Sequence, residues 1–163
     1  TCSSFAGFRR KVGEIPAAGA GLARKSMNVR SFLDTNILVY TDERGAPEKR
    51  EAALDLVESA GVGGWGVVST QVLQEYFSVA TRKLGVPADV ARAKVEIFGR
   101  LDLATTELPT ILGAIDIHRL HDVNFWDALV IYTARAAGCR ILYTEDLQHG
   151  RRFDGLEVVN PFS

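Results

Sequence analysis

The chain has 163 residues, of which 47% are apolar and 24% charged, and no apolar run approaches the roughly 20 residues that span a bilayer. A chain of this length and composition folds most simply as one globular domain with a substantial core. The net charge of −1 conceals an asymmetry, because residues 1–26 carry +4 and the remaining 137 residues carry −5. The acidic charge of residues 27–163 argues against nucleic-acid binding through bulk positive charge.

The two cysteines, Cys2 and Cys139, lie at opposite ends of the sequence without the spacing of metal ligands. This pattern argues against a disulfide framework and against a zinc site. It favours a reducing compartment, and we expect a cytoplasmic protein with no membrane partner.

Residues 1–26 are rich in Gly, Ala, Ser and basic residues, and no stable element is predicted there. The only methionine, Met27, directly precedes the first predicted strand. We therefore expect the domain to cover residues 27–163, with residues 1–26 as a flexible tag, fusion or upstream-translated segment. The alternative is a peptide that docks on the domain through Phe5 or Phe8.

The rest of the chain alternates between short apolar runs and longer helical patterns. Strands are predicted at 29–33, 67–69, 101–105, 140–144 and 156–159, and helices at 37–40, 47–60, 70–83, 87–100, 108–121 and 125–137. Gly61 is expected to end the helix that begins at Pro47. Strands that alternate with helices of this length predict an α/β fold, in which a parallel sheet carries helices on both faces.

Four acidic residues fall where the carboxyl ends of these strands should meet, which is the edge at which open parallel sheets bind ligands. Asp34 ends the first strand, and Glu75 lies near the first turn of the helix after the second strand. Asp127 begins the helix at 125–137, and Asp146 follows the 140–144 strand. Carboxylates next to apolar surface are costly and repel one another, and a divalent cation relieves both effects. Hard oxygen ligands favour Mg²⁺ or Mn²⁺ over Zn²⁺.

Each of three acids also has a purely structural interpretation. Asp34 could cap the helix that begins near Ile37, and Asp146 could cap a turn. Asp127, three residues after Asn124, could favour the dipole of its helix. Glu75 fits no such role, and the joint occurrence of the acids at one edge favours the metal site.

Four segments together resemble a PIN domain, and specifically a VapC-type toxin ribonuclease of a type II toxin–antitoxin pair. They are F-L-D-T-N-I-L-V-Y (32–40), S-T-Q-V-L-Q-E-Y-F (69–77), N-F-W-D-A-L-V (124–130) and L-Y-T-E-D-L (142–147). Any one segment alone is a weak signal, whereas four in this order and spacing are specific. The resemblance covers essentially residues 27–163.

The resemblance implies a three-layer α/β/α sandwich and a Mg²⁺-dependent endoribonuclease, with Mn²⁺ as a possible substitute. It implies an RNA substrate, a cognate VapB-type antitoxin and a homodimer, with the helices after Pro47 and Pro87 as contributors to the dimer. Carried over by position, the metal-binding and catalytic acids are Asp34, Glu75, Asp127 and Asp146, and the polar helpers are Asn36 and Thr144, followed by Thr35 and Ser69.

Two other functions remain open at this point. A haloacid-dehalogenase-like phosphatase also begins with an aspartate after its first strand, but it needs a second aspartate where this chain has Asn36. It also needs a lysine in the later motif, and none precedes Asp146 at suitable spacing. The other alternative is a PIN-fold binding module that lacks cleavage activity.

Aromatic and basic side chains are weaker candidates for RNA contact. Trp65 and Trp126 are expected to pack in the core or a loop, with base stacking as the alternative for Trp126 because it lies beside Asp127. Arg151 and Arg152 are expected to form a solvated pair, with a phosphate contact as the alternative.

Overall fold

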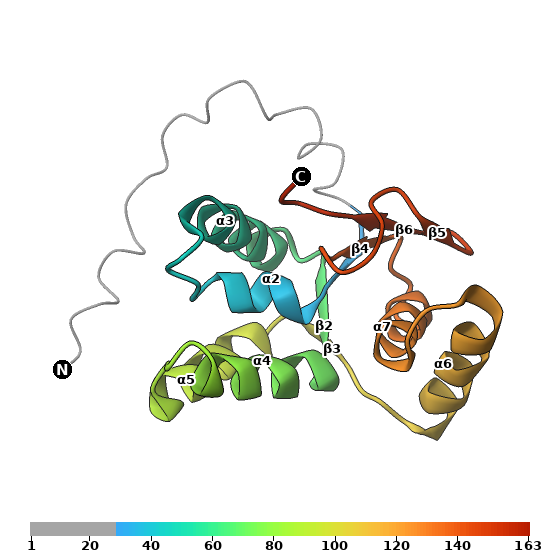
Figure 1. The fold of residues 1–163 in the computed structure, drawn as a ribbon, viewed down its shortest axis with the longest axis horizontal. Helices are drawn as coiled ribbons and strands as arrows, with labels where there is room; N and C mark the ends of the chain where they lie inside the picture. The colour runs from blue at the N-terminus through green and yellow to red at the C-terminus, as the bar shows by residue number, and fades with distance from the viewer. Residues whose placement is uncertain (1–28) are drawn as a thin grey trace.

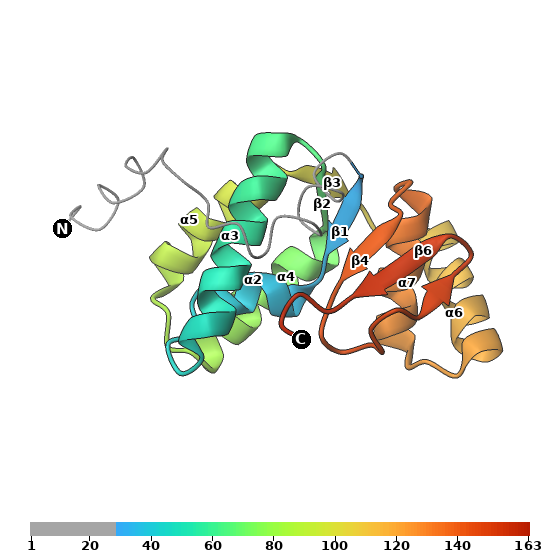
Figure 2. The ribbon, with the colours of Figure 1, turned by 90° about the horizontal axis from the view of Figure 1, so that it is seen from above.

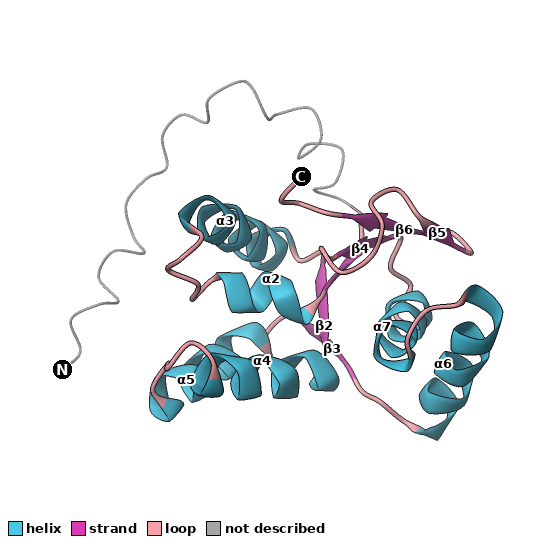
Figure 3. Ribbon diagram, in the orientation of Figure 1, coloured by secondary structure: helices cyan, strands magenta, loops and turns pink. Residues whose placement is uncertain are grey.

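The computed structural model describes residues 29–163, so the predicted extension at residues 1–26 and the domain start at Met27 lie outside the described residues. The described strands are β1 (Ser31–Leu33), β2 (Gly66–Ser69), β3 (Asp102–Ala104), β4 (Ile141–Tyr143), β5 (Arg152–Phe153) and β6 (Leu156–Val159). The described helices are α2 (Thr35–Tyr40), α3 (Pro47–Gly63), α4 (Thr70–Arg82), α5 (Ala88–Phe98), α6 (Leu108–His121) and α7 (Phe125–Ala136) (Figure 3).

The strands form one sheet in the order β3-β2-β1-β4-β6-β5. All neighbouring strands are parallel except β5 and β6, which are antiparallel. Helices α2 to α5 lie on one side of the sheet and α6 and α7 on the other (Figures 1 and 2). The predicted α/β/α sandwich around a central sheet is therefore confirmed, and the sheet is parallel except at β5. No helix within residues 29–163 is both long and apolar enough to cross a membrane.

The central strands are apolar on both faces, as expected for a parallel sheet covered by helices. Phe32 and Leu33 of β1, Val67 and Val68 of β2 and Leu142 of β4 have no exposed surface. Burying each such side chain stabilises the fold by about 1.5 to 3 kcal/mol. Because these buried side chains hold the strands in the core, the residues at which the strands end are also fixed.

The register of β1 and β4 brings two of the predicted site residues side by side. Leu33 pairs with Tyr143, and the backbone N–H of Asp34 donates to the carbonyl oxygen of Tyr143 at 3.1 Å. The first residues beyond these two strands, Asp34 and Thr144, therefore leave the sheet at the same edge.

The predicted end of the helix that begins at Pro47 is wrong. Helix α3 continues through Gly61 to Gly63, and its C-cap is Gly64, which has a φ of 64°. A glycine in this left-handed conformation closes many helices because it has no Cβ to clash with the backbone. The run Gly61-Val62-Gly63-Gly64 offers several such stops, and only the last is used.

Strand β5 was not predicted, and it makes the sheet mixed instead of wholly parallel. Phe153 pairs with Leu156 across a two-residue turn in which Asp154 and Gly155 have φ angles of 46° and 91°. Asp-Gly is a favoured sequence for hairpin turns with two positive φ angles. The hairpin lies at the sheet edge farthest from β3 and does not alter the edge that carries the acids.

Candidate active site

Asp34 occupies the junction between β1 and α2. Its backbone is extended, and one carboxylate oxygen accepts a hydrogen bond from the backbone N–H of Thr35 at 2.7 Å. Only 7% of Asp34 is exposed. The residue caps α2, as the structural interpretation predicts, but the strand that precedes it also places this carboxylate inside the protein at the site edge.

Glu75 projects from the second turn of α4, consistent with its predicted place near the first turn. Ser69 begins this helix by accepting a hydrogen bond from the N–H of Val72 at 3.2 Å. The half-buried Glu75 accepts hydrogen bonds from the hydroxyl of Thr35 at 2.8 Å and from the side-chain amide of Gln71 at 2.7 Å. Thr35 therefore links the β1–α2 junction to α4.

Asp127 lies in the first turn of α7 and is half-buried. Asn124 caps the helix by accepting a hydrogen bond from the N–H of Asp127 at 2.9 Å, and its amide nitrogen donates back to the Asp127 carboxylate. Asp127 thus has the predicted helix-start position. The Asn124 side chain, which is oriented by capping the helix, therefore also holds the carboxylate of Asp127.

The segment after β4 joins α2 through Asn36. The Asn36 amide nitrogen donates to the Thr144 hydroxyl and to the Asp146 carboxylate, both at 3.0 Å. The Thr144 hydroxyl also accepts from the N–H of Asp146 at 3.1 Å, and its side chain hydrogen-bonds Asp34. Thr144 is fully buried, whereas Asp146 is exposed. The two predicted helpers, Asn36 and Thr144, thereby connect Asp34 to Asp146.

The four acids influence one another electrostatically. The pKa of Asp34 is raised to about 7, chiefly by burial and to a lesser degree by the negative charges of Asp146 and Glu75, while the hydrogen bonds from Thr144 and Thr35 lower it. Burial also raises the pKa of Asp127, again with contributions from Asp146 and Glu75. The negative charges of Glu75 and Asp146 therefore disfavour ionisation of Asp34 and Asp127.

These residues are neighbours but not a formed ligand set. Among residues 29–163, no three His, Cys, Asp or Glu side chains are close enough together to hold a metal ion. Two buried oxygens in the same region, Oδ1 of Asn36 and Oε1 of Gln71, have no hydrogen-bond partner. Hard oxygen donors, a carboxyl with a raised pKa and unpaired acceptors all suit a hydrated Mg²⁺ or Mn²⁺ ion.

Two residues of the site were not predicted from the sequence. Gln71 is buried and lies one helical turn before Glu75, so the i to i+4 spacing on α4 could have identified it. Asn124 was considered only as the residue three positions before Asp127, although an Asn at this spacing is also suited to hold the acid.

The two tryptophans differ. Trp65 is 5% exposed, which confirms its predicted packing, whereas 62% of Trp126 is exposed, so the packing predicted for Trp126 is wrong. Trp126 lies in the first turn of α7 and contacts the Phe125 ring edge to face, with the ring centroids 5.3 Å apart.

The prediction of a solvated pair holds for Arg152, which is exposed, but not for Arg151, which is half-buried. Arg151 donates to the carbonyl oxygen of His121 at 2.7 Å and lies over the Phe153 ring. Arg152 pairs with Glu157 across the β5–β6 hairpin. Both arginines therefore have intramolecular partners.

The fold resembles those of solved toxin structures. The VapC20 toxin of Mycobacterium tuberculosis, described as cleaving the sarcin–ricin loop, has 21% sequence identity and a TM-score of 0.59, over 71% of this chain and 91% of its own. A toxin–antitoxin complex from Klebsiella pneumoniae has 16% identity and a TM-score of 0.59, over 80% of this chain and 97% of its own. At these identities the likeness establishes the fold alone. No curated protein matches the chain significantly.

The family model for the PIN domain matches residues 31–154. This range begins at the first residue of β1 and ends in the β5–β6 hairpin, so it contains all four acids and both helpers. Since the match spans well over half of the 163 residues, the chain belongs to the PIN domain family.

Proposed function

We propose that this protein is a metal-dependent endoribonuclease that acts as the toxin of a toxin–antitoxin pair. The observation that supports the proposal is that Asp34 and Asp127 both interact electrostatically with Asp146 and Glu75, while the pKa of Asp34 is raised to about 7, chiefly by burial. A divalent cation would relieve this repulsion. Membership of the PIN family and the structural likeness to toxins support the same assignment.

Asp34, Asp127 and Asp146 would hold the cation directly or through water, with Glu75 completing the site or orienting the attacking water. Bound there, the cation would lower the pKa of its water and offset the negative charge that develops on the scissile phosphate. Within residues 29–163, no three of these side chains lie close enough together to hold a cation. Cation binding would therefore have to draw the acids closer together.

The chain's own residues have defined tasks in this proposal. Thr35 and Gln71 hold Glu75 from two sides, so that its carboxylate is oriented before RNA binds. Asn36 holds Asp146 and Thr144 and leaves its own carbonyl oxygen unpaired for a water or the cation. In-line attack by water on the phosphodiester should leave a 5′-phosphate and a 3′-hydroxyl.

The assay is incubation of the protein with structured RNA and Mg²⁺ or Mn²⁺, with EDTA as one control and Asp127→Asn as another. Asn cannot supply the negative charge but has nearly the same shape, so cleavage should be lost in both controls. RNA cleavage that persists with EDTA and in the variant would contradict the proposal. Metal binding by the wild-type protein without RNA cleavage would favour the binding-module alternative.

The proposal also includes a cytoplasmic location, a cognate VapB-type antitoxin and a homodimer. Exposed apolar side chains on α3 and α5, at Leu54, Val90 and Ile97, support self-association through these helices. Light scattering during size exclusion should give twice the monomer mass. Glu substitutions at Val90 and Ile97 should restore the monomer, and a monomeric wild-type protein would contradict the dimer.

A further inference from the structure

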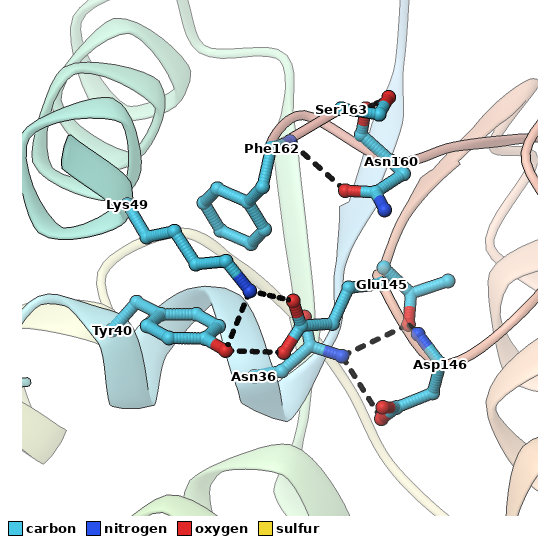
Figure 4. A network of polar contacts seen from close by, with 9 residues as sticks. Asn36, Tyr40, Lys49, Glu145, Asp146, Asn160, Phe162 and Ser163 are labelled. Atoms are coloured by element: carbon cyan, nitrogen blue, oxygen red, sulfur yellow. Dashed lines mark hydrogen bonds and ion pairs between the residues drawn. The ribbon is translucent and has the colours of Figure 1, made fainter. Parts of the chain in front are cut away.

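A second polar cluster lies directly beside the acids, and the functions proposed so far do not use it. We call it the Glu145 cluster; it consists of Tyr40, Lys49, Glu145 and Phe162 (Figure 4). Lys49 donates to one carboxylate oxygen of Glu145 at 2.6 Å, and the Tyr40 hydroxyl donates to the other. Lys49 also lies 3.0 Å from the Tyr40 hydroxyl, which closes a three-membered network.

An aromatic cover shields this network. The rings of Phe162 and Tyr40 meet edge to face, with their centroids 4.8 Å apart. The Lys49 ammonium lies 4.7 Å from the Tyr40 ring centroid and 5.5 Å from that of Phe162. The Glu145 side chain is only 22% exposed and that of Lys49 39%. The Glu145 carboxylate is therefore less accessible to water than one in a surface ion pair, whereas the Lys49 ammonium remains in contact with solvent.

The Glu145 cluster lies on the three-residue segment 144–146, which also carries Asp146. Thr144 and Asp146 are bound by Asn36, whereas Glu145, between them, points to Tyr40 and Lys49 (Figure 4). Asn36 and Tyr40 lie four residues apart on α2 and so share one face of that helix. Helix α2 thus contacts three consecutive residues of the segment.

Anchoring Glu145 restricts where Asp146 can lie. Asp146 is exposed, and an exposed carboxylate that follows a strand would otherwise sample many positions. With Glu145 fixed, the backbone at Asp146 is fixed as well, and its carboxylate stays within reach of Asn36. Partners behind the direct ligands of a metal commonly have this role, and their loss costs roughly 10- to 100-fold in metal affinity.

We propose that Tyr40, Lys49, Glu145 and Phe162 are positioning residues, which hold Asp146 and Asn36 in place for a divalent cation without contacting the cation or RNA themselves. This inference rests on the proposed metal-dependent function. It adds to that function a set of residues outside the acids and their helpers.

The test is Mn²⁺ binding to the full chain in the absence of RNA, measured by electron paramagnetic resonance and calorimetry. Glu145→Gln and Phe162→Ala should each weaken Mn²⁺ binding by about 10-fold or more. Phe162→Leu keeps an apolar cover and should retain most of the affinity. Thermal unfolding of every variant shows whether it is folded at the temperature of the measurement.

Arg135→Met is the matched control, because it breaks another ion pair, with Asp154 at 2.8 Å. Arg135 lies eight residues after Asp127 on α7, about 12 Å along the helix axis. This control should leave Mn²⁺ affinity unchanged. In RNA cleavage, excess Mg²⁺ should restore Glu145→Gln but not Asp127→Asn, because only the latter removes a ligand.

The outcomes separate the two proposals. If the wild-type protein binds no Mn²⁺ and cleaves no RNA, the proposed function fails, and the positioning role fails with it. If the wild-type protein binds Mn²⁺ and the cluster variants bind it equally well, only the positioning role is overturned. Variants with lower melting temperatures and unchanged Mn²⁺ affinity would also overturn it, since the cluster would then serve stability alone.

Discussion

Replacing Asp34 with asparagine is expected to stabilise the metal-free protein while removing its metal binding. The pKa of Asp34 rises from 3.8 to about 7 on folding, chiefly because the carboxyl is buried. Asparagine is a good helix cap and can still accept the hydrogen bond from the N–H of Thr35. The substitution therefore removes the cost of the buried charge and keeps the local contact.

The magnitude follows from the linkage between proton binding and folding. One pKa unit corresponds to about 1.36 kcal/mol, so a rise from 3.8 to about 7 costs the ionised folded protein about 4 kcal/mol as an upper bound. The folded state binds this proton more tightly than the unfolded chain does. The cost is therefore absent below a pH of 3.8 and develops as the pH rises to about 7.

The assay is urea unfolding in EDTA at several pH values between about 4 and 8. The stability of Asp34→Asn relative to the wild-type protein should increase with pH, towards a few kcal/mol at the upper end. Asp55→Asn, at an exposed position of α3, should change little at any pH. An Asp34→Asn difference that does not depend on pH would show that the buried charge of Asp34 does not destabilise the folded protein.

Three further substitutions, the last with a matched control, test separate features of the site and the fold. Glu75→Gln should keep the fold but lower RNA cleavage by at least about 100-fold, as measured with saturating Mg²⁺; wild-type activity would remove this acid from the site. Asn124→Ala should lower the free energy of unfolding by about 1 kcal/mol through the lost helix cap, and unchanged stability in urea would contradict that role. Gly113→Ala should destabilise by about 1 to 3 kcal/mol, because an added Cβ would lie 1.9 Å from the Tyr132 ring. Gly61→Ala, with its nearest neighbour at 3.8 Å, should not destabilise, and equal effects of the two glycine substitutions would refute the packing argument.

The fold was largely predictable because its strands are short apolar runs that end at polar residues. Leu33-Asp34 and Tyr143-Thr144 mark two such ends, and the observed register of β1 and β4 places them together. The end of α3 was not predictable, since Gly61, Gly63 and Gly64 are equally capable of closing a helix. The choice of Gly64 depends on how the chain enters β2, which is a tertiary effect.

Other differences have more specific causes. The Asp154-Gly155 turn carried a hairpin signal, but a two-residue strand is too short to produce a periodic pattern. Trp126 was misjudged because its apolar neighbours in the sequence suggest burial, whereas the first turn of α7 exposes it. Contacts such as Glu145 with Lys49, which are 96 residues apart, depend on the packing of α3 against the segment after β4.

The proposed function requires the acids at the sheet edge to share one divalent cation. Anomalous diffraction from a crystal soaked in Mn²⁺ would locate that cation. We expect a single strong peak at bonding distance from the carboxylates of Asp34 and at least one of Asp127 and Asp146, and no such peak in Asp34→Asn. A saturated soak with no peak at this edge, or with a peak only elsewhere on the protein, would contradict it.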